Sequence, residues 1–324
     1  MPSGAQGAVP VTGGRAWLWR VLGAAFVLTA LGVVVSRLAR DWDDVTAAAA
    51  SYTIGDLLLA FVAAILGLGA TALAWRALLT GLGHRLPLVV AATVFFTSQL
   101  GKYVPGSVWP YVAQARLGAE RGVPGSRAAQ AGVTFVLLHL MTGVVVGVPR
   151  LLLGAGLDAR FGFALLVIPL VLVLVHPAVT TRLVALIARL TKVSVPASSP
   201  TWMSMAVASL WLLLAWALYG GSLAALVAPV QTVSAATFIQ LTSAYALAWS
   251  VGFVGAAVVV VAAPAGLGFR EVALLATLNG VVAAGPAALV VVLSRVLMTL
   301  ADVVWAGAVA AASRARQARQ AQSG

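Results

Sequence analysis

The feature that most constrains this chain is an uncharged apolar stretch that runs from Trp202 to Val227. A helix needs about 20 such residues to cross the hydrocarbon core of a bilayer. The whole chain has the same character, since 62% of its residues are hydrophobic, only 9% are charged and the mean hydropathy is +1.04. Soluble globular domains carry about 25% charged residues. The sequence therefore predicts an all-α, polytopic membrane helical bundle.

We expect about six full membrane spans from the apolar segments. The first segment could also be read as a signal peptide, with a cleavage site in the Ala-rich run at 47–50. Arg37, Arg40 and three aspartates lie between the segment and that run, which favours an uncleaved span. The predicted spans are Val21–Val35, Ile54–Leu79, Ala128–Val148, Phe161–Val175, Trp202–Val227 and Ala287–Ala311.

The formal net charge of the chain is +12. Its basic residues gather between apolar segments and at the C-terminus, where the positive-inside rule and anionic lipid headgroups explain them better than nucleic acid. We therefore expect no nucleic-acid partner, and a cell-membrane protein whose termini and basic loops are cytoplasmic. The expected parts are a disordered cytoplasmic tail at 1–14, a single transmembrane domain at 15–312 and a basic cytoplasmic tail at 313–324, with Asp41, Asp43 and Asp44 in an outer loop.

A first interruption of the apolar pattern spans Ser98 to Trp109 and contains a lysine, hydroxyls and a Pro-Gly pair. An unpaired backbone group in lipid costs several kcal/mol, so such a break needs protein or water around it. The segment Leu86–Tyr103 is short for a full crossing, and the loop after it is basic. A re-entrant hairpin that enters and leaves on the cytoplasmic side keeps this basic loop inside.

A second interruption spans Ala263 to Glu271, with proline and spaced glycines followed by charge. The stretch from Thr232 to Ala263 before it is too long for one plain span, and polar residues such as Thr242 and Ser250 break its apolar character. A second hairpin from the outer side would give an inverted repeat, with broken helices meeting near the midplane around a substrate site. The predicted halves are 15–192 and 201–312.

The chain resembles the lysylphosphatidylglycerol synthase transmembrane family, a family of flippase-like integral membrane proteins, in two motifs. Where that family's second motif usually reads Pro-Gly-Gly-Leu-Gly, Ala265 replaces the first glycine. Members fused to a soluble aminoacyl-transfer domain make aminoacylated phosphatidylglycerol. We expect no such domain here, so the resemblance implies the membrane half, which moves or presents a lipid. The motifs are Gly101-Lys102-Tyr103-Val104-Pro105-Gly106-Ser107-Val108-Trp109 and Pro264-Ala265-Gly266-Leu267-Gly268-Phe269-Arg270-Glu271, with Arg295 downstream.

These two motifs supply the candidate substrate site. Lys102 and Arg270, with hairpin N–H groups and nearby hydroxyls, offer donors and positive charge, the complement of a phosphate. Lys102 would otherwise extend its ammonium group to the cytoplasmic face. The candidate residues are Ser98, Lys102, Tyr103, Pro105, Gly106, Ser107, Gly266, Gly268, Arg270, Glu271 and Arg295.

Charges inside the bundle need partners, because an ionised side chain at the bilayer centre costs about 2.5–3.5 kcal/mol on insertion scales. Arg270 and Glu271 are adjacent and do not face each other on a helix. Arg295 and Asp302 are seven residues apart, on one helix face, and could pair with Glu271 and Arg270. A structural ion network is as compatible with this pattern as a substrate site. His139, within a predicted span, is expected to be a hydrogen-bonded interior residue.

The substrate we expect is a membrane lipid with an anionic phosphate headgroup, phospholipid or polyprenyl-phosphate-linked, moved by a transporter in cell-envelope biogenesis. The alternatives are a membrane subunit of a lipid-linked glycosyl-transfer system and a structural partner of envelope-synthesis enzymes. We expect no enzyme activity, because Glu271 and Asp302 are the only plausible carboxylates within the membrane and no nucleophile triad appears. The chain has no cysteine, and we expect no cofactor and no metal site.

Overall fold

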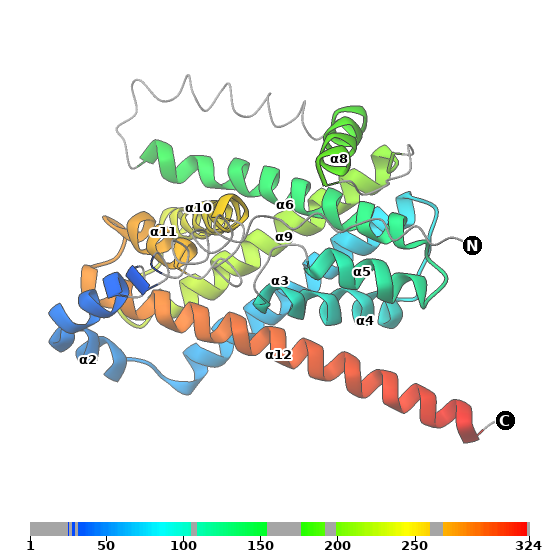
Figure 1. The fold of residues 1–324 in the computed structure, drawn as a ribbon. Helices are drawn as coiled ribbons and strands as arrows, with labels where there is room; N and C mark the ends of the chain where they lie inside the picture. Colours follow the sequence, from blue (N-terminus) through cyan, green and yellow to red (C-terminus); the bar gives the residue numbers. More distant parts are fainter. Residues whose placement is uncertain are drawn as a thin grey trace, which may run out of the picture.

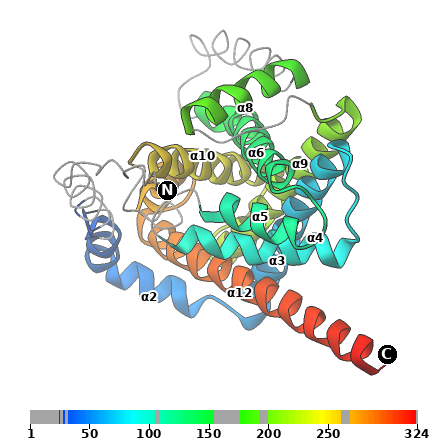
Figure 2. The ribbon, with the colours of Figure 1, turned by 45° about the vertical axis from the view of Figure 1, so that its right-hand side comes forward.

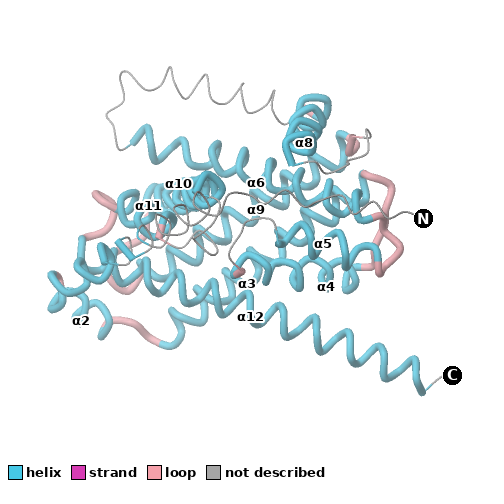
Figure 3. Tube along the Cα trace, in the orientation of Figure 1, coloured by secondary structure: helices cyan, strands magenta, loops and turns pink. Residues whose placement is uncertain are grey.

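A computed structural model describes residues 32–104, 109–153, 176–191, 199–259 and 268–322, together with 25, 28 and 29. These parts are helices and loops, and no strand occurs among them (Figure 3). The elements are α2 (Trp42–Ala50), α3 (Ile54–Gly81), α4 (Leu88–Gln99), the 3-10 helix η1 (Leu100–Tyr103), α5 (Trp109–Ala119), α6 (Gly125–Leu153), α8 (Pro177–Thr191), α9 (Trp202–Val227), α10 (Ala235–Val259), α11 (Phe269–Leu278) and α12 (Ala284–Gln322) (Figure 1). The predicted all-α membrane bundle is confirmed.

Five of these helices are long and apolar enough to cross a membrane: α3, α6, α9, α10 and α12. Four of them match predicted spans, at 54–79, 128–148, 202–227 and 287–311. The other two predicted spans, Val21–Val35 and Phe161–Val175, lie wholly or largely outside the described residues. The predicted number of spans therefore stays a prediction.

The centre of the bundle is the antiparallel pair α3 and α9. Gly67 lies against the ring of Tyr219 and Gly81 against Ser204, so the two helices run alongside each other between these contacts. A Cβ at Gly67 would come within 2.5 Å of the Tyr219 ring. Glycine therefore permits the close approach, as small residues do in membrane helix packing. The N-terminus of α3 is fixed by Thr53, whose hydroxyl accepts from the Asp56 N–H while the Asp56 carboxylate accepts from the Thr53 N–H.

The first hairpin is formed by α4, η1 and α5. Helix α4 has 12 residues, which makes it about 18 Å long, too short to cross a core of about 30 Å. Short connections at 82–87 and 120–124 join the hairpin to α3 and α6 at one end of the bundle (Figures 1 and 2). This is the geometry of the predicted re-entrant segment.

The second hairpin is formed by α10 and α11 and corrects one prediction. Helix α10 is continuous through the polar residues that we expected to interrupt it. The hydroxyls of Thr242 and Ser250 donate to the carbonyls of Phe238 and Ala246 four residues earlier, at 2.8 Å each. This local bonding satisfies the hydroxyls within their own helix, so the helix does not break. Helix α11 is short, with 10 residues, and packs antiparallel to α10.

The order of elements in the second half repeats that of the first. A long helix, a hairpin and a second long helix follow one another as α3, α4–α5, α6 and again as α9, α10–α11, α12. Corresponding helices run in opposite directions, as the antiparallel pair α3 and α9 shows (Figures 1 and 2). The predicted boundaries of the halves, 15–192 and 201–312, stay a prediction.

The acidic segment near the start of the chain and the basic C-terminal segment are helical, which the sequence did not predict. The aspartates expected in an outer loop lie at the start of α2, with Asp43 and Asp44 in its first turn. The predicted basic tail is a continuation of α12, which extends past the rest of the bundle with Arg314 and Arg316 exposed (Figure 1). The predicted tail at 1–14 lies outside the described residues.

Candidate functional site

Both hairpins reach the same helix, α12, from opposite ends of the bundle. Tyr103 at the tip of the first hairpin contacts Asp302, and Glu271 at the start of α11 contacts Arg295. Arg295 and Asp302 are seven positions apart, which corresponds to about 10 Å along α12, on one helix face. Residues at the described ends of two half-helices, far apart in the sequence, thus contact one short section of α12.

At the first hairpin, the charge of Lys102 is paired within the protein. Its Nζ lies 2.6 Å from Oδ2 of Asp302, and the side chains are 29% and 6% exposed. The Tyr103 hydroxyl donates to the same oxygen at 2.6 Å. Lys102 is also in the last turn of η1, where a cation interacts favourably with the negative end of a helix. Lys102 is therefore paired inside the protein, while its predicted role as a substrate-binding cation stays a prediction.

The remaining candidates of the first motif add little to this contact. Ser98 is fully buried, and its hydroxyl donates to the Phe95 carbonyl at 2.7 Å. Pro105, Gly106 and Ser107 lie outside the described residues.

At the second hairpin, Gly268 and Glu271 start α11. Gly268 has φ +90°, which a residue with a side chain adopts only with strain. Oε2 of Glu271 accepts from the Gly268 N–H at 2.7 Å, and Oε1 accepts from Arg295 at 3.2 Å. Glu271 therefore has two roles, capping α11 and pairing with α12. The predicted pair between Glu271 and Arg295 is confirmed, while Gly266 lies outside the described residues.

Lys102, Arg270, Glu271, Arg295 and Asp302 form a charged cluster, and Arg270 differs from its other members in its contacts. It is 8% exposed, and its guanidinium donates to two neutral hydroxyls, Tyr245 at 3.0 Å and Ser294 at 3.1 Å. The guanidinium also lies 4.9 Å from the centre of the Tyr245 ring, a cation–π contact. Its Nε is buried without a hydrogen-bond partner among the described residues. The prediction that Asp302 pairs with Arg270 is wrong, because Lys102 and Tyr103 occupy that carboxylate.

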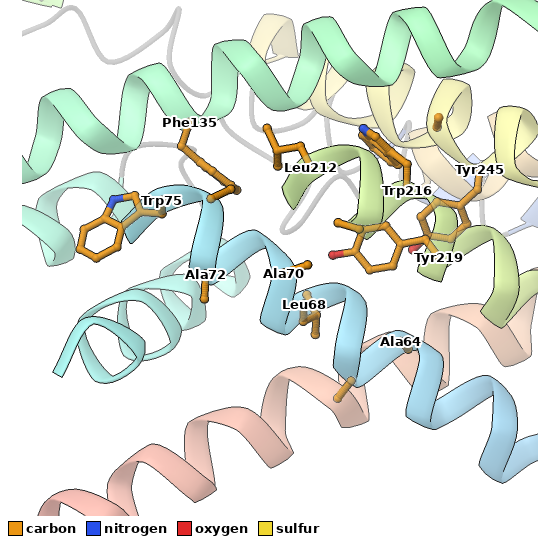
Figure 4. Packing of buried hydrophobic residues seen from close by; sticks show 14 of the residues in the cluster. Ala64, Leu68, Ala70, Ala72, Trp75, Phe135, Leu212, Trp216, Tyr219 and Tyr245 are labelled. Atoms are coloured by element: carbon orange, nitrogen blue, oxygen red, sulfur yellow. The ribbon is translucent and has the colours of Figure 1, made fainter. Parts of the chain in front are cut away.

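The close packing of α11 on α10 fixes the position of Arg270. A Cβ added at Gly252 of α10 would lie 2.8 Å from Cβ of Arg270 and 3.1 Å from its Cα. Tyr245, two helical turns earlier on α10, then stands beneath the guanidinium, with its ring 5.3 Å from that of Tyr219 (Figure 4). The backbone and the charged group of Arg270 are thus both held by α10.

The charges of the cluster do not cancel. Three cations, Lys102, Arg270 and Arg295, face two carboxylates, Glu271 and Asp302, so one positive charge remains. Among the described residues, the ion pairs include Lys102 with Asp302 and Arg295 with Glu271, and none includes Arg270. Helix α11 also begins at this point, and its N-terminal N–H groups add partial positive charge. The arrangement suits an anion beside Arg270.

Sequence reasoning missed the two hydroxyl partners of Arg270. Tyr245 lies within the apolar stretch before the second motif, and Ser294 lies next to Arg295 in an apolar segment. Polar side chains on the helices neighbouring a charged motif are the signal that could have identified them. No group of three metal-ligating side chains occurs in the part of the chain that the structure describes.

His139 also differs from expectation. It is 4% exposed and lies between the rings of Phe135, Trp216 and Trp249, with centroids 5.4, 4.6 and 4.1 Å away. Within the described residues, neither ring nitrogen has a hydrogen-bond partner. The expected hydrogen bond is absent there, and the imidazole packs as part of an aromatic cluster.

The fold and these contacts define a polytopic membrane protein in which two half-helices meet a charged transmembrane helix. The comparison with protein families matches residues 18–306 to the family described as the lysylphosphatidylglycerol synthase TM region. The chain belongs to this family, and it is a multi-pass membrane protein that acts on lipids. A search of curated proteins found no match.

Proposed function

We propose that this protein is a flippase-like transporter that moves an anionic or polyprenyl-phosphate-linked lipid between membrane leaflets, without chemical modification, in cell-envelope biogenesis. The observation that carries the proposal is the state of Arg270. It is a buried guanidinium that has hydroxyl partners and no carboxylate among the described residues. A charge retained inside a membrane helix bundle at a cost of several kcal/mol is expected to serve function.

The position of Arg270 supports transport rather than a purely structural role. It stands at the start of a half-helix, next to the section of α12 that the other hairpin reaches from the opposite end. In transporters built from inverted repeats, the N-termini of broken helices contact anionic substrate groups near the midplane. A phosphate fits the planar donor fork of arginine, which binds it bidentately.

We also propose that the end of the bundle with the α3–α4 and α5–α6 connections is cytoplasmic, together with both termini. Arg76, Arg116, Arg121 and Arg127 lie at or near these connections. A cysteine at Ser126 should resist impermeant thiol reagents added to intact cells, whereas one at Thr232, between α9 and α10, should react. Rapid labelling at Ser126 with protection at Thr232 would reverse the orientation.

The function is tested by lipid translocation in proteoliposomes that contain the purified protein. The wild type should move a fluorescent phosphatidylglycerol between leaflets faster than protein-free liposomes do, and Arg270→Ala should reduce the rate to that background. Arg116→Ala is the matched control, because Arg116 is an exposed arginine whose partner is Glu120. A wild type that moves lipid no faster than protein-free liposomes would overturn the proposal, provided that the protein is folded.

A further inference from the structure

The charge balance of the cluster carries an inference about the substrate. Asp302 accepts from Lys102 and Tyr103, and Glu271 accepts from Arg295 and the Gly268 N–H. Each carboxylate thus forms a neutral pair with one cation, and the remaining charge belongs to Arg270. The sequence segments 105–108 and 260–267, which lie outside the described residues, contain no ionisable side chain. Counted over the described residues, the net charge of this section of the bundle is therefore +1.

The size of the excess matters because charges interact strongly where water is scarce. At the lower effective dielectric constant inside a protein, two unit charges about 4 Å apart interact several times more strongly than they do in bulk water. A headgroup with one net negative charge brings the cluster to neutrality. A zwitterionic headgroup leaves the excess in place, and a doubly charged headgroup reverses its sign.

We propose that this excess of one positive charge, carried by Arg270, selects lipids whose headgroup has a single net negative charge, as in a phosphodiester without an amine. The inference rests on the proposed function and names the substrate class of the same site. It separates phosphatidylglycerol-type lipids from phosphate monoesters, which carry about 1.5 to 2 negative charges at neutral pH. It also separates them from zwitterionic phospholipids, whose phosphate is the same but whose net charge is zero.

Two isosteric substitutions change the charge without removing a cation. Glu271→Gln retains an oxygen for the Gly268 N–H, and Asp302→Asn retains one for the Tyr103 hydroxyl. Each raises the cluster charge to +2, Glu271→Gln on α11 and Asp302→Asn on α12 where the first hairpin contacts it. Glu271→Gln is the sharper variant, because the cation it leaves, Arg295, is 20% exposed, whereas Lys102 is 29% exposed and better screened by water. Glu120→Gln is the matched control, since Glu120 is an exposed carboxylate outside the cluster.

The experiment compares translocation of phosphatidylcholine, phosphatidylglycerol and phosphatidic acid by the wild type and the three variants. The wild type and Glu120→Gln should move phosphatidylglycerol fastest. Glu271→Gln should shift the ratio of phosphatidic acid to phosphatidylglycerol rates on the order of tenfold toward phosphatidic acid. Asp302→Asn should shift it in the same direction by a smaller factor.

Failure of the inference differs from failure of the proposed function. If the wild type moves lipids but headgroup charge has no effect, or Glu271→Gln leaves the preference unchanged, the charge selection is wrong while transport stands. If no lipid moves, the proposed function itself fails. Soluble glycerophosphoglycerol has the same phosphodiester without acyl chains, so it tests whether the site takes a free anion rather than a lipid. Its uptake into the vesicles without lipid movement would assign the site to a free anion and overturn the lipid claim.

Discussion

The two hairpins place a cation at the same section of α12, but only one of these cations is neutralised. In the first, Lys102 pairs with Asp302, and Tyr103 bonds to the same carboxylate. In the second, Glu271 pairs with Arg295, while Arg270 contacts only hydroxyls and an aromatic ring among the described residues. Two motifs that look alike in sequence therefore differ in their contacts: the cation of the first hairpin is paired with a carboxylate of α12, whereas Arg270 of the second is bonded to hydroxyls.

The residue types fit this division. Lysine is a flexible point charge that can exchange partners, whereas arginine is a rigid planar donor suited to phosphate. Arg270 is also positioned more tightly, because Gly252 admits its backbone against α10 and Tyr245 holds its guanidinium. Lys102 is more exposed, at 29%. We infer that Arg270 anchors the anion. Lys102 has a secondary part, because the anion would have to compete with Asp302 for its ammonium group.

Among substitutions of uncharged residues, we expect the largest effect on transport at Gly252. In Gly252→Ala the new Cβ would meet Cβ of Arg270 at 2.8 Å, so α11 must shift. Such overpacking costs about 1–3 kcal/mol and displaces the guanidinium. We expect transport to fall at least about tenfold while the protein stays folded. Gly221→Ala on α9 is the control, because a Cβ there meets nothing within 4 Å. Equal activity of the two variants would show that the α10–α11 contact does not position the site.

An intermediate effect is expected for the pair at the first hairpin. Asp302→Leu leaves Lys102 without its carboxylate, and Lys102→Met leaves Asp302 with only Tyr103. Each single change should lower stability, measured by thermal unfolding in detergent, more than the double change does. The coupling energy should be about 1–3 kcal/mol. Additive single effects would mean that the ion pair does not hold the hairpin on α12.

The smallest effects separate the two tyrosines. Tyr103→Phe removes one hydrogen bond to Asp302 and should cost about 1 kcal/mol of stability. Tyr245→Phe removes one hydrogen bond to Arg270 but keeps the aromatic face beneath it. We expect Tyr103→Phe to change mainly the unfolding temperature and Tyr245→Phe to change mainly the lipid concentration for half-maximal transport. The opposite result would exchange the roles of the hairpins.

Much of the fold follows from the sequence because a membrane makes hydropathy decisive. The span at Trp202–Val227 coincides with α9, and the short segment before Tyr103 is indeed a half-helix. The error at α10 arose because Thr242 and Ser250 look disruptive in sequence, although their hydroxyls bond within the helix. The partners of the charged residues were harder to predict. A spacing of seven residues placed Arg295 and Asp302 on one face, but which hairpin meets which charge depends on tertiary packing.

The most direct test compares Arg270→Ala with Lys102→Ala in one translocation assay with phosphatidylglycerol, each variant checked for folding and membrane insertion. Arg270 has no carboxylate to return to among the described residues, whereas Lys102 is already paired with Asp302. We expect Arg270→Ala to abolish translocation and Lys102→Ala to reduce it by a smaller factor. Wild-type transport by Arg270→Ala, or a greater loss in Lys102→Ala than in Arg270→Ala, would contradict the assignment of Arg270 as the anion anchor.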